Sequence, residues 1–136
     1  MAFRILVVED DAIIRKKEVG LLGGAGYQIV EAENGVKAVE KLGEQRPYNL
    51  IHLDVNIGKG PQGYQLALGI RGGKYGDEKR NMPILFVSDR IAGPLVEAVR
   101  GRSLPKAELE RGSQRYLDLV KEMIGEGELV ASAVED

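Results

Sequence analysis

Short, almost wholly apolar runs recur along the chain and alternate with segments of helical periodicity. The clearest runs are residues 3–8 (FRILVV), 48–53 (YNLIHL) and 83–87 (PILFV), and shorter ones lie at 27–30 and 102–104. A strand that is covered on both faces reads as a continuous apolar run, because neither face meets water. These runs therefore predict five central strands with helices on both sides.

The segments between the runs have the spacing of helices. Helices are expected at 11–25, from Asn34 through Leu42, around Leu66–Ile70, at 94–100 and at 107–124. Gly112 and Ser113 interrupt the last pattern, so that helix is expected to be broken or to start late. The polar stretch 71–81, with three glycines, is expected to be a long exposed loop. Strands that alternate with helices predict an α/β domain with a parallel sheet.

The composition excludes several classes of function. The absence of cysteine excludes a disulfide framework, a thiolate metal site and a cysteine nucleophile. The single histidine, His52, lies inside a buried strand pattern and is expected to be a hydrogen-bonded core residue rather than a phosphohistidine. A net charge of −2 lacks the positive excess of a nucleic-acid binder. With no apolar run long enough for a membrane span and no signal peptide, we expect a cytoplasmic protein without a membrane partner.

Polar residues gather where the expected strands end. They are Glu9, Asp10 and Asp11 after the first run, Asp54 and Asn56 after the third, Ser88 and Asp89 after the fourth, and Lys106 after the fifth. Sites in open parallel sheets lie at the carboxyl ends of the strands. If the first and third strands are neighbours, these side chains converge at one edge of the sheet.

Carboxylates gathered at one edge repel one another. At about 4 Å and an effective dielectric constant near 20, each pair costs on the order of 4 kcal/mol. A divalent cation removes that penalty, and oxygen ligands favour Mg²⁺ or Mn²⁺ over zinc. The Asp54 carboxylate could then attack a phosphoryl group to form an aspartyl phosphate. Lys106 would pair with one phosphoryl oxygen and the Ser88 hydroxyl would hydrogen-bond to another.

The chain resembles the receiver domains of two-component response regulators. The resemblance extends to residue 124 and rests on the order and spacing of the segments ILVVEDD, GYQIVEAENGVKAVEKL, YNLIHLDVN, IGKGPQG, MPILFVS and SLPK. It implies a flavodoxin-like fold, a doubly wound five-stranded parallel sheet with strand order 2-1-3-4-5. Residues 1–124 would form the receiver domain, and residues 125–136 an acidic C-terminal tail that is expected to be frayed.

The resemblance also implies roles for individual residues. By position, Glu9 and Asp10 match the acidic metal pair, Asp54 the phosphoacceptor, Asn56 the residue whose backbone carbonyl binds the metal, Ser88 the switch hydroxyl and Lys106 the phosphate-pairing lysine. The implied function is a stand-alone, Mg²⁺-dependent signalling domain that is not an enzyme. It would receive a phosphoryl group from a sensor histidine kinase or a histidine phosphotransfer protein, and pass its signal to an output protein by contact.

Several residues depart from the family pattern and leave two alternatives open. Asp89 stands where a small residue is usual, Ser103 stands where an aromatic switch residue is common, and the segment 88–106 is short. Pro105 precedes Lys106, whereas receivers usually have proline after that lysine. These departures favour a pseudo-receiver, an interaction module without useful phosphorylation. The second alternative is an aspartyl-phosphate phosphatase, although Asn56 replaces the second aspartate that such enzymes use as general acid.

Overall fold

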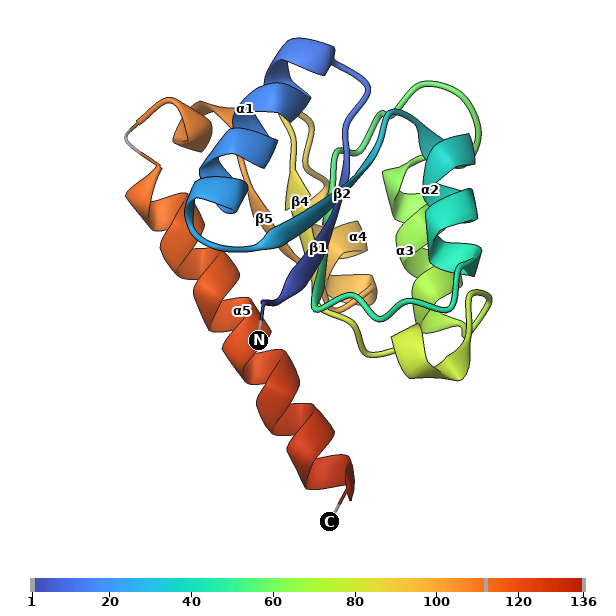
Figure 1. Ribbon diagram of the computed structural model, residues 1–136. Coiled ribbons are helices and arrows are strands. Elements are labelled where there is room, and N and C mark those ends of the chain that lie inside the picture. Colours follow the sequence, from blue (N-terminus) through green and yellow to red (C-terminus); the bar gives the residue numbers. More distant parts are fainter. Residues whose placement is uncertain (1, 112, 136) are drawn as a thin grey trace.

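Five parallel strands form one sheet in the order β2-β1-β3-β4-β5 (Figure 1). The structure is a computed structural model that describes residues 2–111 and 113–135. The strands are β1 (Arg4–Val8), β2 (Gln28–Ala32), β3 (Leu50–Leu53), β4 (Ile84–Val87) and β5 (Arg102–Leu104). Both the parallel pairing and the strand order confirm the predicted flavodoxin-like sheet.

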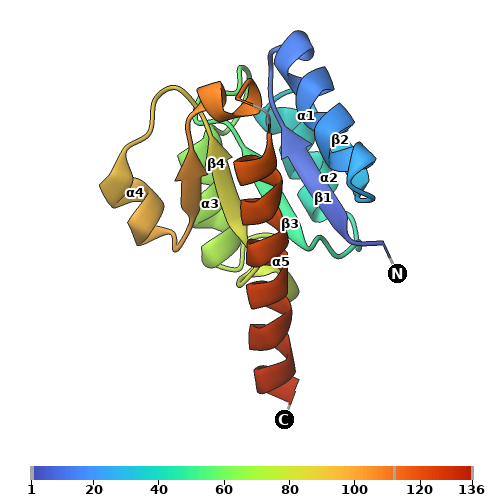
Figure 2. The same cartoon turned by 90° about the vertical axis from the view of Figure 1, so that its left-hand side faces the viewer.

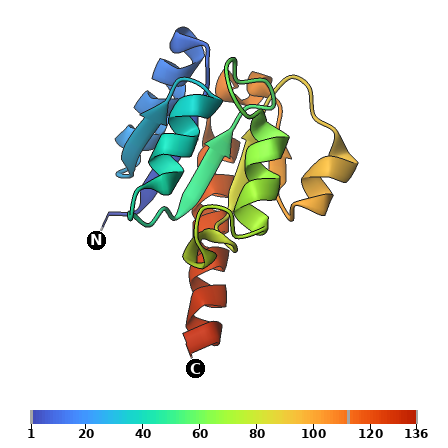
Figure 3. The same ribbon diagram turned by 90° about the vertical axis from the view of Figure 1, so that its right-hand side faces the viewer.

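Helices cover the sheet on both faces. The α-helices are α1 (Ala12–Gly24), α2 (Gly35–Gly43), α3 (Gly63–Arg71), α4 (Gly93–Ala98) and α5 (Gln114–Glu135), and two 3₁₀ helices are η1 (Asp77–Lys79) and η2 (Lys106–Leu109). Helices α1 and α5 pack on one face (Figure 2), and α2 and α3 pack on the other (Figure 3). Ile5 and Val7 of β1 face the first layer, while Leu6 and Val8 face the second. This alternation explains why the strand sequences are apolar throughout.

Helix α1 buries fewer apolar residues than its sequence predicts. Asp11 starts the helix, because its side chain accepts the backbone N–H groups of Ile13 and Ile14. Helical spacing places Ile14, Leu21, Leu22 and Ala25 on one stripe, which Lys17 and Glu18 interrupt. Of these four apolar residues only Leu22 is buried, and Ala25 is exposed. The other buried side chain of the helix is Glu18.

Helix α2 starts at the predicted Asn34 cap, whose side chain accepts the N–H of Lys37 at 2.9 Å. Helical spacing places Val36, Val39 and Leu42 on the expected buried stripe, but Val36 is 46% exposed. Leu42 is buried as expected, and Ala38 is buried with it, four residues earlier on the same side of the helix.

The second half of the chain follows the predicted irregularities. Helix α4 has only six residues, as the short 88–106 segment predicted. The last helix starts late, because η2 replaces its first turn and Ser113 adopts a left-handed φ of 57°. Helix α5 continues to Glu135, while the expected division at residue 124 stays a prediction. Within the described residues, no helix is long and apolar enough to cross a membrane.

The loop expected to be exposed at 71–81 is partly buried. It contains η1, and the Lys79 side chain is only 4% exposed. The Lys79 ammonium donates to the Glu44 carbonyl at 3.2 Å, which explains how a lysine is tolerated there. Arg71 donates to the carbonyls of Arg80, Met82 and Val99. These bonds tie the loop to the end of the sheet opposite the polar strand ends.

Candidate functional site

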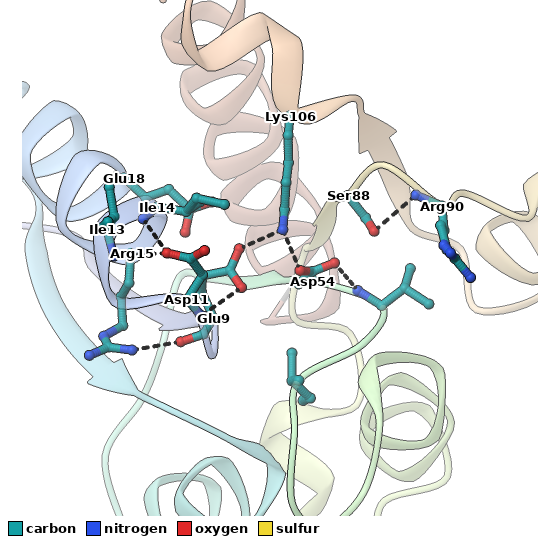
Figure 4. Close-up of polar contacts among 12 residues, drawn as sticks. Glu9, Asp11, Ile13, Ile14, Arg15, Glu18, Asp54, Ser88, Arg90 and Lys106 are labelled. Atoms are coloured by element: carbon teal, nitrogen blue, oxygen red, sulfur yellow. Dashed lines mark hydrogen bonds and ion pairs between the residues drawn. The ribbon is translucent and has the colours of Figure 1, made fainter.

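The sheet register brings the first and third strand ends together. Val8 of β1 is paired with Leu53 of β3, so Glu9 and Asp54 follow at neighbouring positions. Lys106 follows β5 at the same edge of the sheet, where η2 begins. Figure 4 shows these three side chains converging at the carboxyl edge of the sheet. The convergence expected from the sequence is therefore present for Glu9, Asp54 and Lys106.

Lys106 lies between the two acidic residues. Its ammonium donates to Asp54 Oδ2 at 2.7 Å and forms an ion pair with Glu9 Oε1 at 3.0 Å (Figure 4). The contact with Glu9 lacks the alignment of a hydrogen bond. Asp54 Oδ1 accepts the N–H of Val55 at 2.7 Å. Both oxygens of the Asp54 carboxylate are thus held in place, although Pro105 precedes the lysine in this chain.

Burial and charge shift the pKa values of this group. Burial raises the pKa of Glu9 to about 7, and the nearby Asp54 and Asp10 act in the same direction, while the Lys106 contact opposes them. Burial acts to lower the pKa of Lys106, but its contacts with Asp54 and Glu9 outweigh that effect and raise it. The lysine therefore stays cationic at neutral pH and supplies the positive charge that the two carboxylates need.

Three carboxylates at this edge are close enough to bind one cation. Oxygen atoms of Glu9, Asp10 and Asp54 all lie within 4.8 Å of one another. Their all-oxygen donor set suits Mg²⁺ or Mn²⁺. Asp10 is exposed to solvent, which gives an ion a path to the site. Asn56, the fourth expected ligand, is also exposed, and its role stays a prediction.

Ser88 and Asp89 follow β4, which lies next to β3. The Ser88 side chain is buried, and its hydroxyl accepts the backbone N–H of Arg90 at 3.2 Å (Figure 4). Asp89 is exposed and lines a cavity of about 310 Å³ together with Lys17 and Lys106. Asp89 thus lines the same cavity as Lys106, the lysine that contacts Asp54. Its position after β4 predicts that it lies near the phosphorylation site.

A second polar cluster lies beneath this site and was missed at the level of sequence. His52 Nε2 is 2.7 Å from the Tyr116 hydroxyl and 3.6 Å from Glu18 Oε2. The expectation of a hydrogen-bonded core histidine is therefore confirmed. Burial lowers the pKa of His52 to about 4 and raises that of Glu18 to about 9, so both are neutral at pH 7. No local pattern in the sequence pointed to this cluster, because its three residues lie in three different elements.

Comparisons with known proteins agree on one family. The family described as "Response regulator receiver domain" matches residues 5–101. The phosphate regulon transcriptional regulatory protein PhoB of Escherichia coli is 38% identical over 117 residues. That match covers 86% of this chain but 45% of PhoB, so the chain spans about half the length of the curated relatives it matches first.

Solved structures agree with the fold. A response regulator receiver protein from Sinorhizobium medicae has a TM-score of 0.77 at 23% identity, covering 93% of this chain and 97% of that one. The response regulator TrrA of Thermotoga maritima, in complex with Mg²⁺-BeF, has a TM-score of 0.72 at 26% identity, covering 89% of this chain and 98% of that one. The predicted receiver fold is therefore confirmed.

Proposed function

The chain belongs to the family of response regulator receiver domains, and we propose that its Asp54 accepts a phosphoryl group from a phosphohistidine. The observation that carries this proposal is the arrangement at the end of β3. Asp54 contacts Lys106 at 2.7 Å and lies within 4.8 Å of two further carboxylates. The donor would be a sensor histidine kinase or a histidine phosphotransfer protein, and the output would be contact with another protein. A cytoplasmic location is part of the proposal.

In the proposed reaction, an Asp54 oxygen forms the new bond to phosphorus. The bond from phosphorus to the imidazole nitrogen breaks, and that nitrogen keeps the electron pair. Lys106 is placed to pair with a phosphoryl oxygen, because its ammonium already lies against the attacking carboxylate. The Ser88 hydroxyl would hydrogen-bond to a second phosphoryl oxygen after releasing the Arg90 N–H.

A divalent cation fits the carboxylates of this site. Glu9, Asp10 and Asp54, with the backbone carbonyl of Asn56, would hold Mg²⁺ or Mn²⁺, which when bound neutralises charge on the phosphoryl oxygens. Lys106 contacts oxygens of Glu9 and Asp54, two of the residues that would hold the ion, so the ammonium and the cation would compete for these carboxylates.

Two observations favour a pseudo-receiver as the second candidate. Asp89 lines the cavity next to Lys106 and places an additional negative charge near the phosphorylation site. Receivers often have an aromatic residue at the position of Ser103 in β5. With serine there, this chain lacks the aromatic side chain that could respond to phosphorylation. Under this alternative the fold and its partner surface would act without phosphate.

Mass spectrometry of the intact protein after treatment with acetyl phosphate and Mg²⁺ tests the proposal. A gain of about 80 Da on the wild type that is lost in Asp54→Asn would support it. Asp11→Asn is a matched control, because it neutralises a nearby carboxylate while asparagine can still cap α1. An unlabelled wild type that still binds Mg²⁺ would favour the pseudo-receiver. Steady hydrolysis of p-nitrophenyl phosphate would instead favour a phosphatase.

A further inference from the structure

Glu18, His52 and Tyr116 meet inside the apolar layer between the sheet and helices α1 and α5. Glu18 and His52 are each 1% exposed and Tyr116 is fully buried. The Tyr116 hydroxyl hydrogen-bonds to His52 Nε2 at 2.7 Å, and the two rings meet edge to face at 5.5 Å. The Glu18 carboxyl reaches the same nitrogen at 3.6 Å. A single imidazole of β3 is thus held between two helices.

The three elements that meet at His52 also deliver the phosphorylation site. Helix α1 begins two residues after Asp10, and α5 follows the 3₁₀ helix that begins at Lys106. Asp54 is two residues after His52, so the side chains leave the same side of the strand about 7 Å apart. Only Leu53 separates His52 from the phosphoacceptor, so a shift of His52 would also displace the backbone at Asp54.

Stability alone does not account for this cluster. The rest of this layer is apolar, with residues such as Leu22, Leu50 and Val87 around it. Glu18 Oε1 and His52 Nδ1 are buried and have no hydrogen-bond partner among the described residues. Apolar residues of similar volume usually keep or increase stability when they replace such a group. A hydrogen bond fixes the orientation of its two partners as well as their distance. The bond between Tyr116 and His52 therefore fixes how β3 lies relative to α5.

We propose that Glu18, His52 and Tyr116 position Asp54 for phosphoryl transfer by fixing β3 against α1 and α5. This role rests on the phosphoacceptor function proposed above. The three residues touch neither phosphate nor metal and act through the backbone of β3 as positioning residues. Displacing a reacting group by a fraction of an ångström slows transfer while binding of the small-molecule donor is unchanged.

His52 itself reports on the proposed link, because it is the only histidine in the chain. The ¹⁵N signals of its imidazole can be followed by NMR without assignment of other residues. Phosphorylation of the wild type with acetyl phosphate and Mg²⁺ should shift these signals. The same treatment of Asp54→Asn should leave them at their Mg²⁺-bound positions. Ring signals that do not move when Asp54 is labelled would overturn the proposal.

Labelling kinetics provide the second measurement. Tyr116→Phe removes only the hydroxyl, and Tyr48→Phe is a matched control on the opposite face of the sheet, where the hydroxyl donates to Lys41. At saturating Mg²⁺ and acetyl phosphate, we expect Tyr116→Phe to lower the labelling rate constant on the order of tenfold. The half-saturating concentrations should stay close to those of the wild type, and Tyr48→Phe should label normally. The melting temperature of Tyr116→Phe should fall, because the substitution leaves His52 Nε2 buried without its hydrogen-bond partner, so labelling is measured well below the melting temperature of the variant.

A pair of substitutions at Glu18 separates positioning from packing. Glu18→Gln keeps the volume and a polar group about as far from His52 as the 3.6 Å carboxyl contact, and should label like the wild type, whereas Glu18→Met keeps only the volume and should be slow. If Glu18→Met does not fold, the labelling rate of Tyr116→Phe alone tests the positioning role. Equal rates in folded wild type, Tyr116→Phe and Glu18→Met would overturn the positioning role alone. A wild type without any label would overturn the phosphoacceptor function, and the positioning role with it.

Discussion

Replacing Glu18 by glutamine should change how the stability of the protein depends on pH. Burial raises the pKa of Glu18 from 4.5 to about 9 in the folded state, and the charges of Glu9 and Asp54 add to this shift. A folded-state pKa above the unfolded value means that the folded protein holds the proton more tightly. The stability that protonated Glu18 contributes is thus fully present below 4.5 and is lost as the pH rises through about 9.

The shift sets an upper limit on the size of the effect. Each pH unit between the two pKa values corresponds to about 1.4 kcal/mol, so the wild type loses at most about 4 kcal/mol between roughly pH 5.5 and pH 8.5 from this residue. Glutamine has no proton to lose, so this contribution to the pH dependence is absent from the variant. Relaxation around an ionised carboxylate lowers the figure, and we expect a difference of about 2–3 kcal/mol between variant and wild type at the upper pH.

Urea unfolding of both proteins across this pH range, without divalent ions, measures the difference. Glu9, His52 and Lys106 titrate in both proteins, so their effects largely cancel in the comparison. The free energies of unfolding should agree within about 1 kcal/mol near pH 5.5 and separate as the pH rises, with Glu18→Gln the more stable. Two parallel curves would refute the reasoning, because they would show that Glu18 is already ionised at neutral pH.

Three further substitutions address the site itself. Asp10→Asn should weaken Mg²⁺ binding at least tenfold in isothermal titration calorimetry, since one of three clustered charges is lost; unchanged affinity would remove Asp10 from the ligand set. Lys106→Met should tighten Mg²⁺ binding, because no ammonium then competes at Glu9 and Asp54, and should slow labelling of Asp54; weaker Mg²⁺ binding would contradict this competition. Asp89→Ala should raise the labelled fraction under a fixed acetyl phosphate regime, and the gain should shrink as salt screens the charge. Equal labelling of wild type, Asp89→Ala and Asp89→Asn at low and high salt would show that Asp89 does not act on the phosphoryl group.

The sheet and its polar edge could be predicted because both depend on local patterns. Strands covered on two faces must be continuously apolar, and the carboxyl ends of parallel strands meet at one edge. Once Val8 and Leu53 were neighbours, the meeting of Glu9 and Asp54 followed from the topology. The short length of α4 could also be predicted, because the shortened segment 88–106 leaves no room for a longer helix.

The helix faces were less predictable, because tertiary packing decides which residues are buried. Val36 is apolar and lies on the expected stripe, yet the small Ala38 faces the sheet in its place. Glu18 read as a break in the pattern of α1, and nothing local indicates that a glutamate is buried. Its partners are distant in the sequence: His52 is in β3 and Tyr116 is in α5. Only the assembled fold reveals that three isolated polar residues form one cluster.

The charges at the site suggest how its two states differ. With its carboxylates ionised, the group of Glu9, Asp10, Asp54 and Lys106 carries an excess of two negative charges, which a divalent cation would balance. Burial raises the pKa of Glu9 to about 7, so a bound cation would also favour the ionised form of this residue. Phosphorylation replaces the charge of the Asp54 carboxylate by between one and two phosphoryl charges and so adds up to about one negative charge, and Asp89 lies close enough to add to the same field. The phosphorylated form would therefore carry more negative charge than the metal-bound form. Lys17 lines the same cavity and pairs with Glu110 at 3.9 Å, so the residues of this cavity offer little positive charge beyond that of Lys106. A partner that presents cationic side chains here would bind the phosphorylated form more tightly, and binding would stabilise the aspartyl phosphate by the same free energy.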